Sequence, residues 1–499
     1  MGTYDARQRK MILSGVLLAT FLAAIEGTVT GPAGPAIVGE FQGMHWLSWI
    51  FTAYLLAMAV TTPIFGKISD LFGRKPVFIG GTAVFLLGSL LCGLAQSMEQ
   101  LIVFRAIQGL GAGALTPMTF TIIGDIYPIE ERGKTQGLLS SVWGISSLVG
   151  PLLGGYAVDY LSWRWVFVFN LPFGLLAMFV IMRYLKEDRV RRKTKIDVLG
   201  ALLFAAGMGL LLFCLSTGGE SIPWTSPWLL AALFGSVLLL LVFLFVEVHA
   251  SEPMLPLKLF SIRSISVSTA ANLLASTLII GLSTYVPLWV QGVAGRSAAA
   301  SGLLLAPMSV GWMGGSFAGG RLLLRYGPRR TAVAGLVLVT LGAAMLAVMA
   351  QTASPLYLLV PTLFCGVGFG CASIVFTVIA QSSVGYELRG SSTALNTFTR
   401  SLGQTVGVAV FGTWLNLRIS RLLADAPGGA EGLDVNNLLS PHGAGGAAGE
   451  VSSSLAGALY GGLHSLFIVM AVLAALSLLI STGFGRSLPG DGQPAESGR

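Results

Sequence analysis

Charged side chains are scarce in this chain. Asp, Glu, Lys and Arg together make up 10% of its 499 residues, less than half of their usual share of about 25% in soluble proteins. Hydrophobic residues make up 54%, and the mean hydropathy is +0.78. This composition excludes an ordinary soluble domain and predicts a polytopic membrane protein.

Residues that hold metals or nucleotides are equally sparse. The four cysteines lie in apolar stretches, without the spacing of a metal site or of extracellular disulfides. No nucleotide-binding loop, catalytic cluster or attached soluble domain is visible in the sequence. We therefore predict no cofactor, no metal site and no enzymatic activity.

The apolar runs are about twenty residues long, which suits helices that cross a bilayer rather than barrel strands. We predict an all-α protein with fourteen transmembrane helices. They are expected at residues 11–36, 46–68, 77–96, 100–124, 136–158, 164–184, 197–217, 227–248, 265–290, 298–320, 331–351, 355–380, 392–416 and 457–481.

The basic residues predict how these helices are oriented. An even number of spans places both termini on one side of the membrane. With both termini in the cytoplasm, all Lys and Arg fall in cytoplasmic segments except Arg105 and Arg400 within spans and Arg164, Arg296, Arg418 and Arg421 outside. The net charge of +8 then reflects this topology and contact with anionic lipids, and nucleic-acid binding is excluded.

The chain contains an internal repeat. The glycine-bounded basic loop at Gly66–Lys75 returns at Gly320–Arg329, between spans of the two halves. The spans divide into six, two and six. We predict an N-terminal bundle at residues 11–184, a basic linker with two inserted helices at 185–263, a C-terminal bundle at 264–481 and a cytoplasmic tail at 482–499.

Several motifs resemble the major facilitator superfamily, and within it the fourteen-helix drug:proton antiporters. Besides the loop Gly66–Lys75, these motifs are Leu101–Gly113, Gly144–Gly155 and the run from Trp163 to Pro172. The resemblance covers residues 11–481 and implies the major facilitator fold. It also implies a cytoplasmic latch between the two halves, formed by Gly66, Asp70, Gly73, Arg74 and Asp125. Leu324 replaces the acid in the second copy, so we assign the latch to the first copy.

The run Gly144–Gly155 resembles the antiporter motif of the fifth helix. Its members are Gly144, Gly150, Pro151, Gly154 and Gly155. Small residues let helices approach closely, and a proline can kink a helix. The alternative is generic packing, because glycine is common throughout this chain.

Glu26 is the leading candidate for proton coupling. It lies roughly 22 Å into a hydrocarbon core of roughly 30 Å, at the same depth as Arg105. An acid within a membrane span is a functional candidate by default. The alternative is a static structural ion pair.

Arg400 lies near the middle of its span, with Asn396 and Gln404 one turn away on the same face. It could receive an anionic or hydrogen-bonding part of a substrate, pair with another carboxylate, or bind backbone carbonyls. Aromatic residues, among them Tyr54 and Trp143, could line a cavity for flat apolar cations or serve only in packing.

Together these features predict a monomeric antiporter in the plasma membrane. It would exchange protons for amphipathic, cationic small molecules by alternating access. An exporter of an endogenous lipid, siderophore or amino acid would use the same scaffold. A non-transporting receptor or a membrane-embedded enzyme is a remote alternative.

Overall fold

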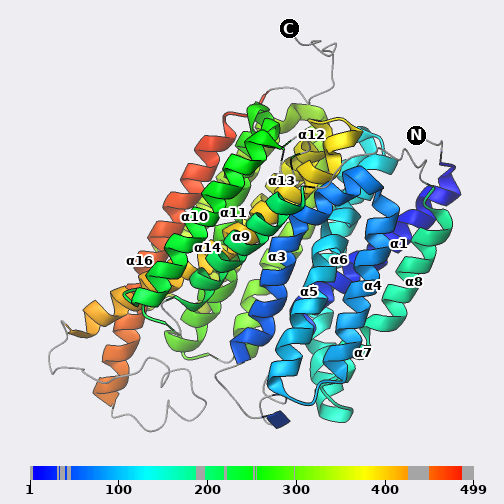
Figure 1. Ribbon diagram of the computed structural model, residues 1–499. Helices are drawn as coiled ribbons and strands as arrows, with labels where there is room; N and C mark the ends of the chain where they lie inside the picture. The colour runs from blue at the N-terminus through cyan, green and yellow to red at the C-terminus, as the bar shows by residue number, and fades with distance from the viewer. Residues whose placement is uncertain are drawn as a thin grey trace.

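The computed structural model describes residues 4–30, 33, 37, 40–41, 47–186, 197–218, 222–250, 253, 256–296, 298–424 and 449–485. The described chain is helical (Figure 1). Most of the predicted basic linker and tail, namely residues 187–196 and 486–499, lies outside these residues.

The elements are α1 (Ala6–Val29), α3 (Leu47–Phe72), α4 (Arg74–Gly93), α5 (Met98–Ile126), α6 (Ile129–Tyr160), α7 (Trp165–Val168), α8 (Asn170–Tyr184), α9 (Val198–Thr217), α10 (Pro227–His249), η2 (Leu257–Ser261), α11 (Arg263–Gly292), α12 (Ala298–Ala347), η3 (Pro355–Leu358), α13 (Leu359–Ser382), α14 (Tyr386–Ala424) and α16 (Gly449–Ser481).

Short polar side chains mark where several helices begin. Asp5, Ser97 and Asp197 precede α1, α5 and α9, and each side chain accepts a hydrogen bond from a backbone N–H in the first turn. These bonds satisfy donors that have no partner within the helix. Polar residues thus set the starts of helices whose interiors are apolar.

Eleven helical segments in the described chain are long and apolar enough to cross a membrane. α12 contains two predicted spans, which Gly327 separates with a non-helical backbone (φ 79°). α6 and α14 coincide with two further predicted spans but do not reach the same apolarity. α1 ends at Val29 rather than at residue 36, because Gly31-Pro32 and Pro35 follow it.

The helices form two groups with separate cores. One large core contains residues of α11, α12, α13, α14 and α16. Three other clusters draw on α1, α3, α4, α5, α6, α7 and α8. Figure 1 shows these groups beside each other, with α3 next to α14. The exact domain boundaries remain a prediction.

The inserted helix α9 packs against both groups at the α3–α14 contact. The ring of Phe204 lies 5.6 Å from that of Phe398 on α14. The ring of Phe213 lies 5.4 Å from that of Trp49 on α3. The helix α10 covers α9, and large side chains of α10 such as Phe245 remain exposed. The inserted pair therefore covers the contact between α3 and α14.

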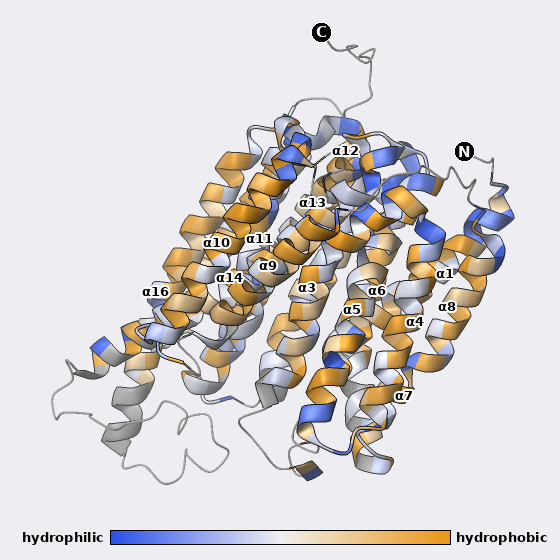
Figure 2. Ribbon diagram, in the orientation of Figure 1, coloured by the Kyte–Doolittle hydropathy of each residue, from blue (hydrophilic) through white to orange (hydrophobic). Residues whose placement is uncertain are grey.

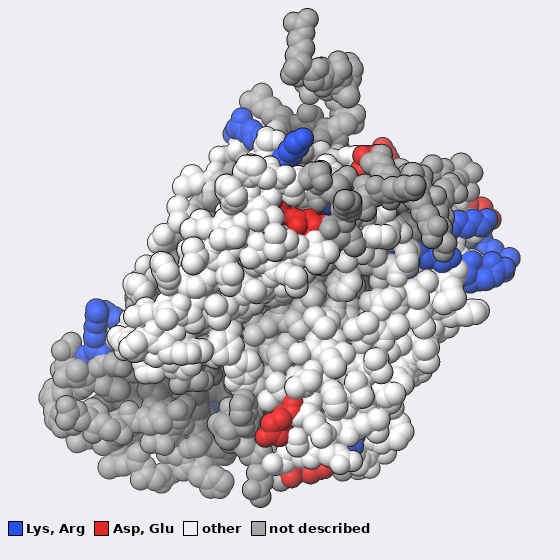
Figure 3. Space-filling view, in the orientation of Figure 1, with Lys and Arg blue, Asp and Glu red and all other residues white. Residues whose placement is uncertain are grey.

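Charge and hydropathy divide the surface into zones. Hydrophobic residues dominate the outward faces along the middle of the helices (Figure 2). On the visible face, charged side chains gather toward the two ends of the bundle (Figure 3). We call the end where α1 begins at Ala6 and α16 ends at Ser481 the termini end.

The two halves touch at the termini end, where α6 meets α12. A Cβ added to Gly133 of α6 would lie 2.7 Å from the Cα of Gly320 on α12, so the two backbones are in direct contact. A Cβ added to Gly144 or Gly314, nearer the opposite end, would meet no described atom within 4 Å. The structure is therefore closed at the termini end.

Candidate functional site

Arg74 lies at the centre of a buried charge cluster at the termini end. Its guanidinium forms ion pairs with Asp70 (2.9 Å) and with Asp125 of α5 (3.1 Å). It also donates hydrogen bonds to the carbonyl oxygens of Ser69 and Tyr386, both at 2.7 Å. The side chains of Arg74 and Asp70 are 3% and 2% exposed, so solvent screens this pair little.

Asp70 joins the cluster to the other half of the protein. Its two carboxylate oxygens accept hydrogen bonds from the backbone N–H groups of Gly390 (2.8 Å) and Ser391 (2.6 Å). The hydroxyl of Ser391 donates a third bond at 2.6 Å. All three donors belong to the second turn of α14.

Asp125 makes a second connection between the halves. It pairs with Arg389 of α14 at 2.7 Å. Arg389 also donates to the carbonyl oxygen of Gly124, and Arg132 of α6 donates to the hydroxyl of Ser382. Asp70, Arg74 and Asp125, the charged residues assigned to the latch, therefore lie together, and each contacts the C-terminal half.

The sequence analysis did not predict the partners on the C-terminal side. The second loop copy supplies no carboxylate, as expected, but α14 supplies Arg389 and its backbone donors. A signal for them exists, because Glu130-Glu131-Arg132-Gly133 at the start of α6 returns as Glu387-Leu388-Arg389-Gly390 at the start of α14. This second repeat marks the starts of two helices, α6 and α14, that contact the opposite half.

The two glycines of the first loop serve different purposes. Gly73 has φ 100°, a conformation that residues with a Cβ rarely adopt, and α4 begins directly after it. Gly66 lies within α3, where an added Cβ would come 2.2 Å from that of Ala394 on α14. Gly73 therefore permits the turn, whereas Gly66 permits the contact between the halves.

The glycines predicted as the antiporter motif lie in the middle and second half of α6, away from the termini end. Gly150 and Gly154 are buried, whereas a Cβ added to Gly144 would meet no described atom within 4 Å. The surroundings of Pro151 and Gly155 lie outside the part of the chain that the structure describes. Close packing against the opposite half occurs instead at Gly133 and Gly137, nearer the termini end.

Glu26 and Arg105 form an ion pair inside the N-terminal group. Glu26 is 0% and Arg105 is 1% exposed. Arg105 also donates to Gln108 Oε1 (2.7 Å) and to the carbonyl oxygen of Ile50 (2.9 Å), and its guanidinium lies 4.4 Å from the centre of the Tyr54 ring. The equal depth that the sequence predicted is confirmed by this contact.

Further polar side chains extend the pair into a network. Asn170 of α8 donates to Glu26 Oε2 (2.7 Å) and to Ser89 Oγ (2.9 Å). Ser89 of α4 in turn donates to the carbonyl oxygen of Phe167. The Glu26 network, as we call these contacts, connects α1, α3, α4, α5, α7 and α8. In this conformation it is closed to any substrate.

The motif from Trp163 to Pro172 also makes contacts at the end opposite the termini end. Trp163 Nε1 and the Arg164 guanidinium both bind the carboxylate of Glu40, at 2.7 and 2.8 Å. The hydrogen bonds from Arg164 and then Trp163 hold the pKa of Glu40 below its ordinary value. The contact ties the segment after α1 to the turn before α7.

Arg400 of α14 lies beside α6 of the opposite half. Its guanidinium is 5.8 Å from the centre of the Trp143 ring on α6, in the opposite half. It forms no ion pair or hydrogen bond with the described residues. Asn396, one turn away, accepts from Asn272 Nδ2 of α11 (3.0 Å), and Gln404 is half-buried. The predicted carboxylate partner is not found among the described residues.

The described residues contain no group of three His, Cys, Asp or Glu side chains that could hold a metal ion. All four cysteines are buried and unpaired. The candidate sites are thus the latch at the termini end, the Glu26 network and the region around Arg400.

Solved structures share the fold. The human organic anion transporter MFSD10 superposes with a TM-score of 0.63 at 15% identity, over 96% of this chain and 100% of that one. The proton:xylose symporter XylE superposes with a TM-score of 0.64 at 14% identity, over 97% and 98%. At these identities the likeness concerns the fold alone.

Sequence comparison is more specific. The Major Facilitator Superfamily profile matches residues 16–408. The multidrug transporter protein MdtP of Bacillus subtilis is 35% identical over 419 residues, 84% of this chain and 77% of that protein. Multidrug resistance protein 3 of the same bacterium is 36% identical over 434 residues, 87% and 85%. This multi-pass membrane protein, a transporter and not an enzyme, therefore belongs to the major facilitator superfamily.

Proposed function

We propose that this protein exports amphipathic small molecules from the cell by antiport with protons. The single observation that carries the proposal is the Glu26 network, a carboxylate buried within a predicted membrane span and paired with Arg105. The similarity to two multidrug transporters supports the choice of substrate class. We further propose the fourteen-span topology with both termini in the cytoplasm, and a monomer in the plasma membrane.

The conformation fits the outward-facing state of an alternating-access cycle. With the proposed topology, the termini end is cytoplasmic, and the latch and the contact between Gly133 and Gly320 close it. Opening toward the cytoplasm would break the bonds of Asp70, Asp125 and Arg389 to the opposite half. The latch therefore stabilises one of the two states that transport requires.

Protonation of Glu26 would act through the network rather than by direct competition with a substrate. Glu26 is fully enclosed, so a substrate does not reach it in this state. Adding a proton removes the negative partner of Arg105 and changes the bonds to Asn170. Because these bonds join helices of one group, a proton can alter how that group packs.

Arg400 favours a second substrate class. Cationic substrates follow from the antiporter resemblance, yet the cation of Arg400 faces the opposite half beside an aromatic ring. A guanidinium without an ionic partner suits an anionic or zwitterionic group. Amphipathic anions and zwitterions are therefore the second candidate substrates.

Transport by the purified full-length chain in liposomes tests the function. We expect cationic dyes, anionic dyes or both to accumulate in the vesicles when the lumen is acidic and the cytoplasmic face points outward. Accumulation should stop when a protonophore removes the pH gradient. Transport that continues unchanged with the protonophore would contradict antiport with protons.

Replacing Asp70 by Asn should slow transport and weaken closure at the termini end. An amide keeps one acceptor oxygen but loses the ion pair with Arg74, and hydrogen bonds to charged groups contribute about 1.5–3 kcal/mol each. The transport rate measures the first effect. Labelling of a cysteine introduced at the termini end, with a thiol reagent added from the cytoplasmic side, measures the second. Glu130→Gln, which changes an exposed acid at the same end, is the matched control. Normal transport by Asp70→Asn would show that Asp70 does not act as a latch between the two halves.

Replacing Arg400 by Ala should weaken the apparent affinity for anionic substrates by roughly tenfold, because one charge-assisted hydrogen bond is lost. Cationic substrates should be unaffected or improved. Arg400→Lys keeps the charge and should retain part of the anion preference. Competition between one anionic and one cationic dye measures the change. A variant that fails to accumulate in the membrane would indicate a structural role instead.

A further inference from the structure

The second copy of the repeated loop carries positive charge without the acids of the first. In the first copy, Arg74 follows Gly73 and is neutralised by Asp70 and Asp125. In the second copy, Gly327 repeats the positive φ, at 79°, and α12 continues through Pro328 into Arg329 and Arg330. Leu324 occupies the place of Asp70. Neither Arg329 nor Arg330 forms an ion pair with the described residues.

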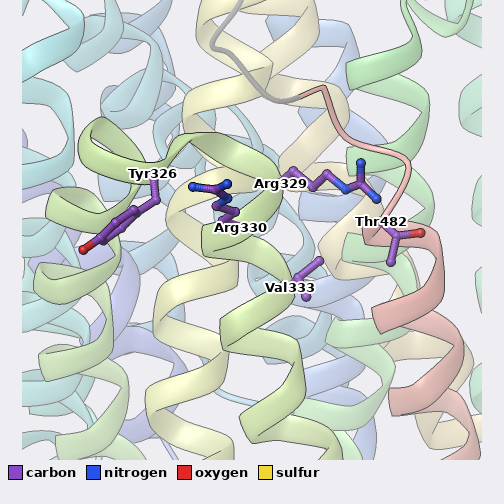
Figure 4. Close-up of a pocket in the computed structure, with 5 residues that line it drawn as sticks. All are labelled: Tyr326, Arg329, Arg330, Val333 and Thr482. Carbon is purple, nitrogen blue, oxygen red and sulfur yellow. The ribbon is translucent and has the colours of Figure 1, made fainter.

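These two arginines line a cavity at the termini end. It has a volume of about 590 Å³ and lies between the second part of α12 and the end of α16, with Tyr326, Val333 and Thr482 as further lining residues. In Figure 4, Arg329 extends toward Thr482, and Arg330 lies on the side of Tyr326. The cavity therefore presents two guanidinium groups, which extend to opposite sides, and the hydroxyl group of Thr482.

The local backbone adds to this positive potential. Because the backbone breaks at Gly327, Arg329 and Arg330 lie in the first turn of the helix that follows. Cations at the start of a helix are unfavourable, since the helix dipole is positive there. An anion in the cavity would offset both the dipole and the two guanidinium charges. Phosphate oxygens suit guanidinium forks and hydroxyl donors in particular.

The surface below the cavity indicates the source of the phosphate. On α12, Val333 is followed at helical spacing by Val337 and Leu341, which are 38% and 49% exposed. On α16, Leu476 and Leu479 are 44% and 64% exposed below Thr482. α12 and α16 pack against each other. A molecule with a phosphate in the cavity would thus have apolar chains along two apolar stripes.

We propose that the cavity between α12 and α16 binds the phosphate headgroup of an anionic membrane lipid. Arg329 holds the phosphate beside the hydroxyl of Thr482, and Arg330, on the side of Tyr326, adds positive charge to the cavity. The acyl chains lie along α12 and α16 in the cytoplasmic leaflet. The bound lipid supplies the negative charge that Asp70 supplies in the first copy. This site is separate from substrate transport.

The double variant Arg329→Gln/Arg330→Gln in the full-length protein tests the site. Native mass spectrometry would measure phosphatidylglycerol retained after delipidation, and titration with this lipid would measure the shift in thermal unfolding. We expect the double variant to bind it at least about tenfold more weakly than the unaltered protein, because charge-assisted bonds are lost. The charge-matched control is Lys10→Gln/Arg321→Gln, two exposed cations at the same end that do not line the cavity. This control should bind the lipid normally.

Two further probes separate the possible outcomes. Phosphatidylcholine, which has no net charge, should stabilise both double variants and the unaltered protein equally. Glycerol 1-phosphate should compete weakly; if it binds as tightly as the lipid, the site takes a soluble phosphate and the lipid assignment is wrong. Equal binding of phosphatidylglycerol by all three proteins, or no binding by any, would overturn the proposal and leave the arginines as topological signals.

Discussion

Replacing Glu26 by Gln is expected to abolish proton-driven export. The amide cannot release a proton or carry negative charge, so the proposed exchange step is lost. The change also leaves Arg105 buried without its ionic partner, and breaking a buried pair in this way costs about 3–5 kcal/mol. We therefore expect a lower unfolding temperature as well as loss of transport. Glu99→Gln, which alters an exposed acid of the same half, should change neither quantity.

A second variant separates coupling from stability. In Glu26→Gln/Arg105→Gln the unpaired cation is also removed, so part of the thermal stability should return. If Glu26 carries the proton, export driven by a pH gradient should remain absent in this double variant. If the pair is purely structural, transport should return together with stability. Undiminished proton-driven export by the single variant would exclude Glu26 as the coupling residue.

The sequence predicted most of the fold because apolar length is a local property. Each of the predicted spans coincides with a helical segment, and the differences lie at their ends. α14 runs from Tyr386 to Ala424, beyond the predicted 392–416, because its polar ends continue as helix outside the apolar stretch. Chain orientation relative to the membrane rests on the basic residues alone and remains a prediction.

The candidate sites were predicted less completely, for a physical reason. Asp70 and Arg74 stand out because charges are rare in this chain. Asp70 accepts from the backbone N–H groups of Gly390 and Ser391, and Arg74 donates to the backbone carbonyl of Tyr386. Such backbone groups occur in almost every residue, and Gly390 is 320 positions from Asp70. Likewise, Asn170 and Ser89 are neutral residues whose role depends on packing around Glu26. Such contacts appear only when the tertiary structure brings the helices together.

Replacing Gly133 by Ala should shift the protein away from the state closed at the termini end. The new Cβ would lie 2.7 Å from the Cα of Gly320, closer than atoms can approach, so α6 and α12 would have to part. Overpacking of this kind costs about 1–3 kcal/mol, which changes the ratio of two states by roughly 5- to 150-fold. Because opening at this end does not require the contact, the open state should not carry this cost. Export should slow accordingly.

Spin labels at Lys10 of α1 and Arg263 of α11 would measure the shift, since both positions are exposed at the termini end and the four native cysteines are buried. Gly133→Ala should add or enlarge a population with a longer distance between the labels. Gly314→Ala is the matched control on α12, because its Cβ would meet no described atom within 4 Å. If both variants give the distance distribution and export rate of the unaltered protein, the contact between Gly133 and Gly320 does not determine closure. In that case the bonds of Asp70, Asp125 and Arg389 would have to hold the termini end closed without it.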